Sequence, residues 1–262
     1  MSRRLRRLAV ALAVTVLVLA LGGAAAWFWW VPHYRPSLRA GESYGIDVSH
    51  HQGEIDWKRV AADGVHFAYI KSTEGADHVD PRYVENWTGS ALAGLDRAPY
   101  HFFTLCRPGV DQAHNFLGAY IQADLPPAVD LELAGNCAAR PSRADVEREL
   151  LAFLDVVEED LEEPMVLYVG DDWRAAYGLP PGERPLWLRR VLRRPPGDWA
   201  VWQVMGNAAV DGIEGPVDLN VMRLPRPPAE HGTLKITTRE RGPTRFRVGV
   251  ASGRRGVGRR VR

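Results

Sequence analysis

The sequence has few cysteines and no clustered metal ligands, and both shortages exclude classes of site. Of its 262 residues only two are cysteines, Cys106 and Cys137. Two thiols without histidines at ligand spacing do not make a zinc site, so we expect no metal and no cofactor. Each cysteine follows a predicted strand by a few residues. In a domain outside the cytoplasm, that arrangement favours a disulfide between two neighbouring loops.

A basic core is also missing, although both ends of the chain are basic. Residues 1–31 hold four arginines and no acid, and residues 226–262 carry a net charge of +9. Because the whole chain has a formal charge of +1, residues 32–225 must carry −12. An acidic body does not suit binding to nucleic acid, so we expect no nucleic-acid partner.

Charged side chains are absent from residues 8–31, a run of 24 mostly apolar residues. About 20 such residues span a bilayer as a helix, and the arginines before them predict an N-terminus in the cytoplasm. The aromatic run Trp27-Phe28-Trp29-Trp30 is typical of a membrane interface and favours an uncleaved anchor. The alternative is a signal peptide cleaved near Gly23-Ala24-Ala25-Ala26, followed by secretion. Both readings predict an extracytoplasmic domain.

The remainder divides into a linker, one folded domain and a tail. Residues 32–43 contain two prolines and a glycine and are interpreted as the linker. Residues 44–225 hold the strand and helix patterns of the domain, which we expect to be monomeric. Residues 226–262 become rich in Arg and Gly without a sustained apolar period, which predicts a disordered basic tail. This tail is either inert or a ligand of anionic lipids or cell-wall polymers.

Strand and helix patterns alternate through the domain. Helices are predicted at 54–64, 81–95, 110–122 and 143–161, with a turn-rich region after the fifth strand. Strands are predicted at 44–49, 65–71, 98–103, 128–133, 165–169, 186–188, 199–203 and 217–221. Five alternations and then three strands with short connections predict a parallel α/β barrel with an abbreviated end. In such barrels, polar residues at the carboxyl ends of strands line the active site.

The fourth predicted strand carries two acids, Asp130 and Glu132. Two positions apart on a strand, they point to the same face, with Cα atoms about 6.5–7 Å apart. Two carboxylates in one cleft raise each other's pKa, so that one holds a proton near neutral pH. That arrangement suits general acid chemistry at an acetal, whereas on an exposed strand the same acids would only be solvated. Other polar residues at strand ends are Asp47, Lys71, His101, Gln203 and Asp218.

Several short segments of the domain match known sequence blocks in their order and spacing. They are Tyr44-Gly45-Ile46-Asp47-Val48-Ser49-His50-His51-Gln52-Gly53 with Ile55-Asp56-Trp57, Phe67-Ala68-Tyr69-Ile70-Lys71 with Thr73-Glu74-Gly75, Tyr100-His101-Phe102-Phe103, Asp130-Leu131-Glu132, and Trp199 to Gln203 with Gly212-Ile213 and Val217-Asp218-Leu219-Asn220. In this order and spacing they resemble the sequence blocks of the glycoside hydrolase family 25 muramidases. Each block alone is weak, but together they are highly specific and cover residues 44–224.

The resemblance implies a fold, a reaction and roles for four acids. The fold is a flattened, TIM-like barrel of five β/α units followed by three further strands. The reaction is hydrolysis of the β-1,4 bond between N-acetylmuramic acid and N-acetylglucosamine in peptidoglycan glycan strands. Glu132 matches the family's proton donor, and Asp130 matches a partner proposed to steer or stabilise the substrate's acetamido group. Asp47 and Asp218 match the other two cleft acids, and the mode of attack on the anomeric carbon stays open.

Further residues in these blocks and strands are candidates for substrate binding. They are Tyr69, Lys71, Glu74, Tyr100, His101, Tyr168, Trp187, Trp202 and Gln203. The alternative for the tyrosines and tryptophans is barrel packing, for His101 a buried core position, and for Glu74 a local salt bridge. The sixth strand departs from the family, because Leu186-Trp187-Leu188 runs into Arg189-Arg190. These arginines change one wall of the cleft, bind a carboxylate of the peptide stem, or form a solvated basic turn.

Two other functions fit part of the pattern. Chitinase-like barrels also end their fourth strand in Asp-x-Glu, but they carry a longer run of acids before it, where this chain has Pro126-Pro127-Ala128-Val129. A non-catalytic glycan-binding module would have lost the acids, and all four are present. The preferred prediction is therefore a muramidase outside the cytoplasm, attached to the membrane by its N-terminal segment.

Overall fold

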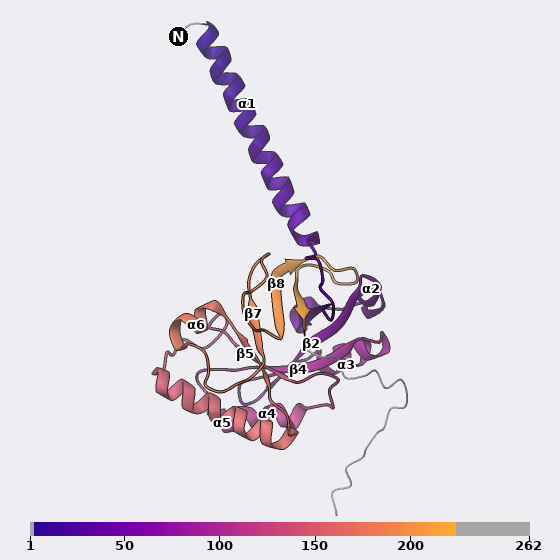
Figure 1. Ribbon diagram of the computed structural model, residues 1–262, viewed down its shortest axis with the longest axis vertical. Coiled ribbons are helices and arrows are strands. Elements are labelled where there is room, and N and C mark those ends of the chain that lie inside the picture. The colour runs from indigo at the N-terminus through magenta and orange to yellow at the C-terminus, as the bar shows by residue number, and fades with distance from the viewer. Residues whose placement is uncertain (1–2, 224–262) are drawn as a thin grey trace, which may run out of the picture. The chain divides into compact units, whose positions relative to one another are not determined.

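The strands form one closed barrel. In the computed structural model, which describes residues 3–223, the ring order is β1, β9, β8, β7, β6, β5, β4 and β2, and β1 pairs with β2 to close it. The bounds are β1 Ser43–Val48, β2 Val65–Glu74, β4 Asp96–Phe102, β5 Ala128–Leu131, β6 Val166–Val169, β7 Leu186–Arg189, β8 Val201–Ala208 and β9 Val217–Met222. A short strand, β3 (His78–Val79), pairs with β2 beside the ring. The predicted barrel of eight strands is confirmed (Figure 1).

Pairing directions divide the barrel into the two predicted parts. All pairs from β1 through β2 and β4 to β8 are parallel, whereas β9 is antiparallel to both β8 and β1. The helices of the five β/α units are α2 Trp57–Ala62, α3 Tyr83–Leu92, α4 Gly109–Ala119, α5 Arg143–Leu161 and α6 Asp171–Tyr177. Helix α6 lies where only turns were predicted, because seven residues are too few to establish a helical period.

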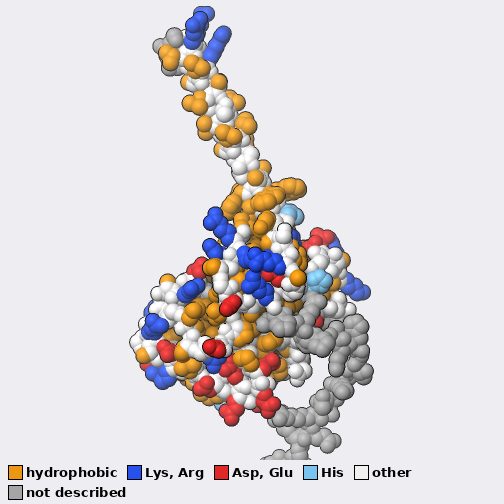
Figure 2. Space-filling view, in the orientation of Figure 1, with side chains coloured by type: hydrophobic (Ala, Val, Ile, Leu, Met, Phe, Trp, Pro, Cys, Tyr) orange, Lys and Arg blue, Asp and Glu red, His pale blue; other side chains and the backbone are white. Residues whose placement is uncertain are grey.

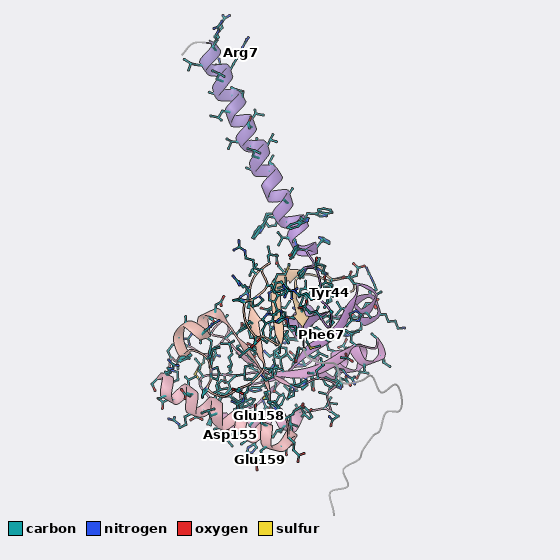
Figure 3. All side chains as sticks on the ribbon, viewed as in Figure 1. Arg7, Tyr44, Phe67, Asp155, Glu158 and Glu159 are labelled. Carbon is teal, nitrogen blue, oxygen red and sulfur yellow. A yellow bond between two sulfur atoms is a disulfide. The ribbon has the colours of Figure 1, made fainter. Side chains whose placement is uncertain are left out.

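Aromatic side chains fill the inside of the ring below its carboxyl end. Tyr69 packs against Phe67 and Trp187, with ring centroids 6.2 and 4.8 Å apart. Gly45 makes room for this packing, because a Cβ there would lie 2.3 Å from the ring of Phe67 (labelled in Figure 3). The floor of the barrel is therefore a packed core, and a ligand can reach the interior from the carboxyl ends of the strands.

Helix α5 shows how the outside of the barrel is covered. The Ser142 hydroxyl accepts a hydrogen bond from the backbone N–H of Asp145 at 3.2 Å and begins the helix at its predicted residue. Its apolar face is buried, while Asp155 and Glu159 lie on the exposed face (Figure 3). Helices α4 and α5 lie side by side (Figure 1). Their backbones approach closely at Gly109 in α4, where a Cβ would meet the backbone of α5.

The residues interpreted as a linker are bound to the barrel. Ala209 N donates to Pro32 O at 2.9 Å, and Arg35 Nη2 donates to Ala209 O at 2.7 Å. Glu42, whose side chain is only 2% exposed, pairs with Arg194 and Arg223. Residues 32–43 are therefore a strap along the domain, held by contacts to residues far away in the sequence.

The N-terminal segment is helical and apolar. Helix α1 (Arg3–Ala25) continues through single turns to His33, and the whole helix Arg3–His33 is long and apolar enough to cross a membrane. None of the residues of α1 is buried, and Figure 2 shows hydrophobic side chains along it with arginines near its start. This finding fits both an anchor and a signal peptide. The predicted basic tail, 226–262, lies outside the described residues.

The predicted disulfide between Cys106 and Cys137 is confirmed. It joins the loop after β4 to the loop after β5, at the carboxyl end of the barrel. Asn136, next to the bridge, accepts from Leu105 N at 2.9 Å and donates to Glu132 O at 3.0 Å. The bridge and Asn136 therefore restrain the backbone of the loop that carries Glu132.

Replacing both cysteines with alanine is expected to lower the free energy of unfolding by about 3 to 4 kcal/mol, because the cross-link closes a loop of roughly 30 residues in the unfolded chain. Urea denaturation of the purified full-length protein, followed by tryptophan fluorescence, measures this loss. Reduction of the wild-type chain should produce the same shift. A variant less than about 1 kcal/mol below wild type would contradict the proposed restraint.

Candidate active site

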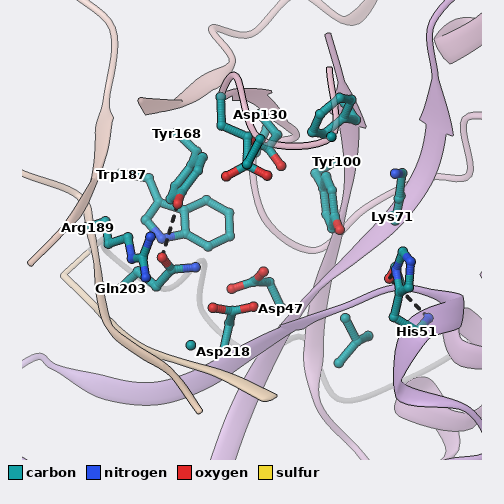
Figure 4. Close-up of a pocket in the computed structure, with 18 of the residues that line it drawn as sticks. Asp47, His51, Lys71, Tyr100, Asp130, Tyr168, Trp187, Arg189, Gln203 and Asp218 are labelled. Atoms are coloured by element: carbon teal, nitrogen blue, oxygen red, sulfur yellow. Dashed lines mark hydrogen bonds between the residues drawn. The ribbon is translucent and has the colours of Figure 1, made fainter. Parts of the chain in front are cut away.

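A cleft of about 620 Å³ opens at the carboxyl end of the barrel. Four acids line it. Asp47 comes from β1, Asp130 from β5 and Asp218 from β9 (Figure 4), and Glu132 comes from the loop after β5. The structure thus brings together the four acids singled out in the sequence. Strand β5 ends at Leu131, so Glu132 lies one residue beyond the strand on which it was predicted.

Asp47 is held from the neighbouring strand. Asn220 Nδ2 donates to Asp47 Oδ2 at 2.7 Å, and Trp187 Nε1 donates to Asn220 Oδ1 at 2.9 Å. Burial is the main cause that raises the pKa of Asp47 well above its usual range, and the charge of Asp218 adds to it, while the hydrogen bond from Asn220 opposes both. Asp47 and Asp218 are direct partners in the β1–β9 ladder, so it is unfavourable for both to be ionised at the same time.

Asp130 has a buried oxygen with no hydrogen-bond partner among the described residues. Burial raises the pKa of Asp130 well above its usual range, and the charges of Glu132 and Asp47 raise it further. A buried acceptor without a donor is destabilising, typically by about 1–3 kcal/mol. Asp130 lines the cleft, so a ligand with an N–H or O–H group that reaches this carboxyl group could satisfy the oxygen.

Glu132 has the properties of a general acid. Its pKa is raised to about 7, first by burial and then by the charges of Asp172 and Asp218, against the opposing charges of Arg189 and Lys71. A carboxyl group with a pKa near 7 holds its proton through a large part of the neutral range. The pKa of Asp218 is raised to about 6 by burial, so this second acid ionises first.

The walls of the cleft are polar and aromatic. Six predicted substrate-binding residues line them: Lys71, Glu74, Tyr100, Tyr168, Trp187 and Gln203. Tyr168 donates its hydroxyl to Gln203 Oε1 at 3.1 Å (Figure 4), and Lys71 Nζ pairs with Glu74 at 2.6 Å. Aromatic faces beside hydrogen-bonding groups are suited to sugar rings, which present both apolar faces and hydroxyl edges.

The structure places the other three predicted substrate-binding residues away from the cleft. The prediction that they contact the sugar directly is therefore corrected. His101 is fully buried outside the ring, where it bonds to Thr73 and Gln112 and stacks on Phe153. Trp202 also points outward. Tyr69 points inward but lies below the cleft, where its hydroxyl donates to a backbone oxygen. Strand alternation explains the first two, because their neighbours on each side face inward.

Several cleft residues were not among the predicted site residues. Phe102 lies two positions after Tyr100, so alternation along the strand could have identified it. Arg189, two positions after Trp187, lines the cleft, in agreement with one of the alternatives given for the arginines that follow the sixth strand. His51 lines the cleft and shares a hydrogen bond with Ser49 (Figure 4). Asp172 influences Glu132 from the start of α6 and had no signal in the sequence, because that helix was not predicted. Among residues 3–223 no group of His, Cys, Asp and Glu is arranged to hold a metal ion.

Comparison with known proteins decides the family. The model of the family "Glycosyl hydrolases family 25" matches residues 46–213, which include the cleft acids on β1 and β5. The chain belongs to glycosyl hydrolases family 25. The resemblance inferred from the sequence blocks is confirmed, and the chain is a glycosidase.

Known relatives of this family 25 hydrolase include bacterial enzymes. A family 25 glycosyl hydrolase structure from Bacillus anthracis is 29% identical with a TM-score of 0.66, covering 72% of this chain and 93% of that one. Lysozyme M1 of Streptomyces globisporus is 30% identical, covering 67% of this chain and 66% of that protein. Uncharacterized protein YegX of Escherichia coli (strain K12) is 37% identical, covering 72% of this chain and 75% of that protein.

The contact between Asp172 and the loop after β5 leads to a test of pKa control. Asp172 Oδ2 accepts from Leu133 N at 3.0 Å, directly after Glu132. In Asp172→Asn a negative neighbour is lost, so the pKa of Glu132 should fall. Because the donor must be protonated to act, the alkaline limb of the pH–rate profile should move to lower pH, by roughly half a unit for this exposed group.

The measurement is the pH dependence of hydrolysis by the family 25 enzyme and its variant. Asp171→Asn is the matched control, since Asp171 is an exposed neighbour that does not contribute to the raised pKa of Glu132. An alkaline limb that stays in place in Asp172→Asn, or moves equally in both variants, would show that Asp172 does not tune the donor.

Proposed function

We propose that Glu132 is the proton donor with which this muramidase cleaves the β-1,4 bond between N-acetylmuramic acid and N-acetylglucosamine in peptidoglycan. The observation that carries the assignment is the position of Glu132 in a cleft with three other acids, where burial raises its pKa to about 7. A glycosidic oxygen is a poor leaving group until it is protonated. Similarity to Lysozyme M1 supports peptidoglycan as the polymer.

The chemistry begins with transfer of a proton from Glu132 to the glycosidic oxygen, while the bond between that oxygen and the anomeric carbon breaks. Positive charge then develops on the sugar ring. Asp218 ionises with a pKa of about 6, so it is charged while Glu132 still holds its proton and can stabilise this charge. Water supplies the new hydroxyl group at the anomeric carbon, and its released proton restores Glu132.

Asp130 and Asp47 have orienting roles in this proposal. The unpaired oxygen of Asp130 accepts the N–H of the 2-acetamido group, which turns the acetamido oxygen toward the anomeric carbon or toward the attacking water. Asp47, fixed by Asn220, supports the position of the same group from β1. Tyr100, Tyr168 and Trp187 stack on the sugar rings.

The decisive variant is Glu132→Gln, which keeps the size of the side chain but has no acidic proton. It is expected to lower the release of reducing ends from purified peptidoglycan by at least about 100-fold. The thermal midpoint of unfolding should not fall, because a buried titratable group is replaced by a neutral one. Glu159→Gln on the exposed face of α5 is the matched control and should retain full activity.

Undiminished hydrolysis by Glu132→Gln would overturn the assignment of the donor. The substrate is tested in the same assay by mass analysis of the new reducing ends, which should be N-acetylmuramic acid. Cleavage of chitin with no action on peptidoglycan would instead support the chitinase-like alternative.

We also propose that the helix Arg3–His33 anchors the enzyme in the cytoplasmic membrane with its catalytic domain on the outside. Three features support this location: the helix is long and apolar enough to cross a membrane, arginines lie at its start, and the aromatic residues Trp27–Trp30 lie near its end. The strap would then keep the barrel close to the outer surface of the membrane, because its backbone is bound to Ala209. One catalytic domain carries all four acids, which supports a monomer.

Fractionation of cells producing the full-length chain tests this location. The anchored enzyme should sediment with membranes, stay there in high salt and alkaline carbonate, and retain its N-terminus in mass spectrometry. External protease should digest the catalytic domain in spheroplasts. A soluble product that starts after Ala26 would identify the segment as a cleaved signal peptide.

A further inference from the structure

Arg189 is a cation on the cleft wall, and no acid among residues 3–223 forms an ion pair with it. It is the last residue of β7, two positions after Trp187, and both side chains line the cleft (Figure 4). Pairing of its backbone with Gln203 on β8 fixes where the side chain starts. Within residues 3–223 the guanidinium of Arg189 makes no side-chain hydrogen bond and no ion pair, whereas Lys71 is paired with Glu74 at 2.6 Å.

The acids of the cleft do not neutralise Arg189 by direct contact. Its charge lowers the pKa of both Glu132 and Asp218, but neither carboxylate lies within ion-pair distance. The five N–H donors of the guanidinium therefore remain available in a planar fork, a geometry that matches a carboxylate with two parallel hydrogen bonds.

The charge of the cleft gives this cation a role in substrate binding. Asp218, which ionises with a pKa of about 6, gives the cleft a negative charge that repels an anionic polymer, and Lys71 is already paired with Glu74. An anionic strand therefore needs a compensating cation where its charged group passes the wall. Arg189 is exposed at that wall, so it can meet a group that projects from the sugar chain.

We propose that Arg189 binds a carboxylate of the glycan strand and selects strands that carry one. The inference rests on the proposed function, since each N-acetylmuramic acid bears a lactyl carboxyl group. That group is free on a bare strand and amide-linked to a stem peptide on an intact one, where the peptide contributes its own carboxylates. A polymer of N-acetylglucosamine has no such group, so this contact also separates peptidoglycan from chitin.

The test compares the full-length enzyme in detergent with Arg189→Gln and Arg189→Lys on three soluble glycan strands. The first keeps its stem peptides, the second has lost them to an amidase and exposes lactyl carboxylates, and the third has all carboxylates coupled to methylamine. Arg189→Gln should raise KM about three- to tenfold on a carboxylate-bearing strand, as expected for one partly exposed charged contact. It should not change KM on the amidated strand, and Arg189→Lys should recover part of the loss.

Comparison of strands separates binding from an effect on the acids. Loss of the Arg189 charge also raises the pKa of Glu132, but that change acts on all three strands alike. Arg190→Gln is the matched control, because Arg190 is the exposed neighbour and does not line the cleft. A loss seen on the stem-bearing strand alone identifies a peptide carboxylate as the ligand, and a loss on the stripped strand identifies the lactyl group.

An equal loss on amidated and native strands, or no loss on either, would overturn the proposal. Binding measurements keep it independent of turnover. Calorimetry with Glu132→Gln, with and without Arg189→Gln, should give the same three- to tenfold difference in affinity. This difference corresponds to about 1 kcal/mol of binding free energy. Absence of hydrolysis by the wild-type enzyme would refute the proposed function, while the calorimetric difference would still decide the role of Arg189.

Discussion

Four carboxyl groups share one cleft, and the rest of the structure depends on holding them there against their mutual repulsion. Burial raises the pKa of each, so the folded domain favours the protonated forms. For such groups the stability is fully present below the unfolded pKa of about 4 and is lost as pH rises through the folded values, which are about 6 for Asp218 and about 7 for Glu132. The site therefore destabilises the fold most at pH values at which its acids are ionised.

A closed ring of strands tolerates that destabilisation because it leaves the acids no way to separate. Asp47 and Asp218 are fixed opposite each other by the β1–β9 ladder, and Asn220 joins Asp47 to the indole of Trp187. Beneath them Tyr69 and its aromatic neighbours exclude water from the floor. The same apolar packing that stabilises the barrel thus lowers the local dielectric and raises the pKa of the acids above it.

The parts of the fold that could be predicted from the sequence are those that depend on local periodicity. It identified all eight strands of the ring and the helix at 143–161, and the pair Asp130 and Glu132 was visible because an i, i+2 spacing needs no tertiary information. The resemblance of their segments to the family favours a cleft position for His101 and Trp202, but strand alternation places both outside the ring. The depth of Tyr69 and the bonds from the strap to Ala209 depend on contacts distant in sequence, and no local pattern contains them.

The sequence blocks and the tuning of the donor belong to different parts of the chain. The four acids and their supporting amide lie in segments that resemble the family, and they define the reaction. Asp172 and Arg189 act on Glu132 with opposite charges from α6 and from the end of β7, one raising its pKa and the other lowering it. Both lie outside the blocks that resemble the family, and neither transfers a proton in the proposed reaction. The pH range and the preferred strand can therefore change while the four acids stay the same.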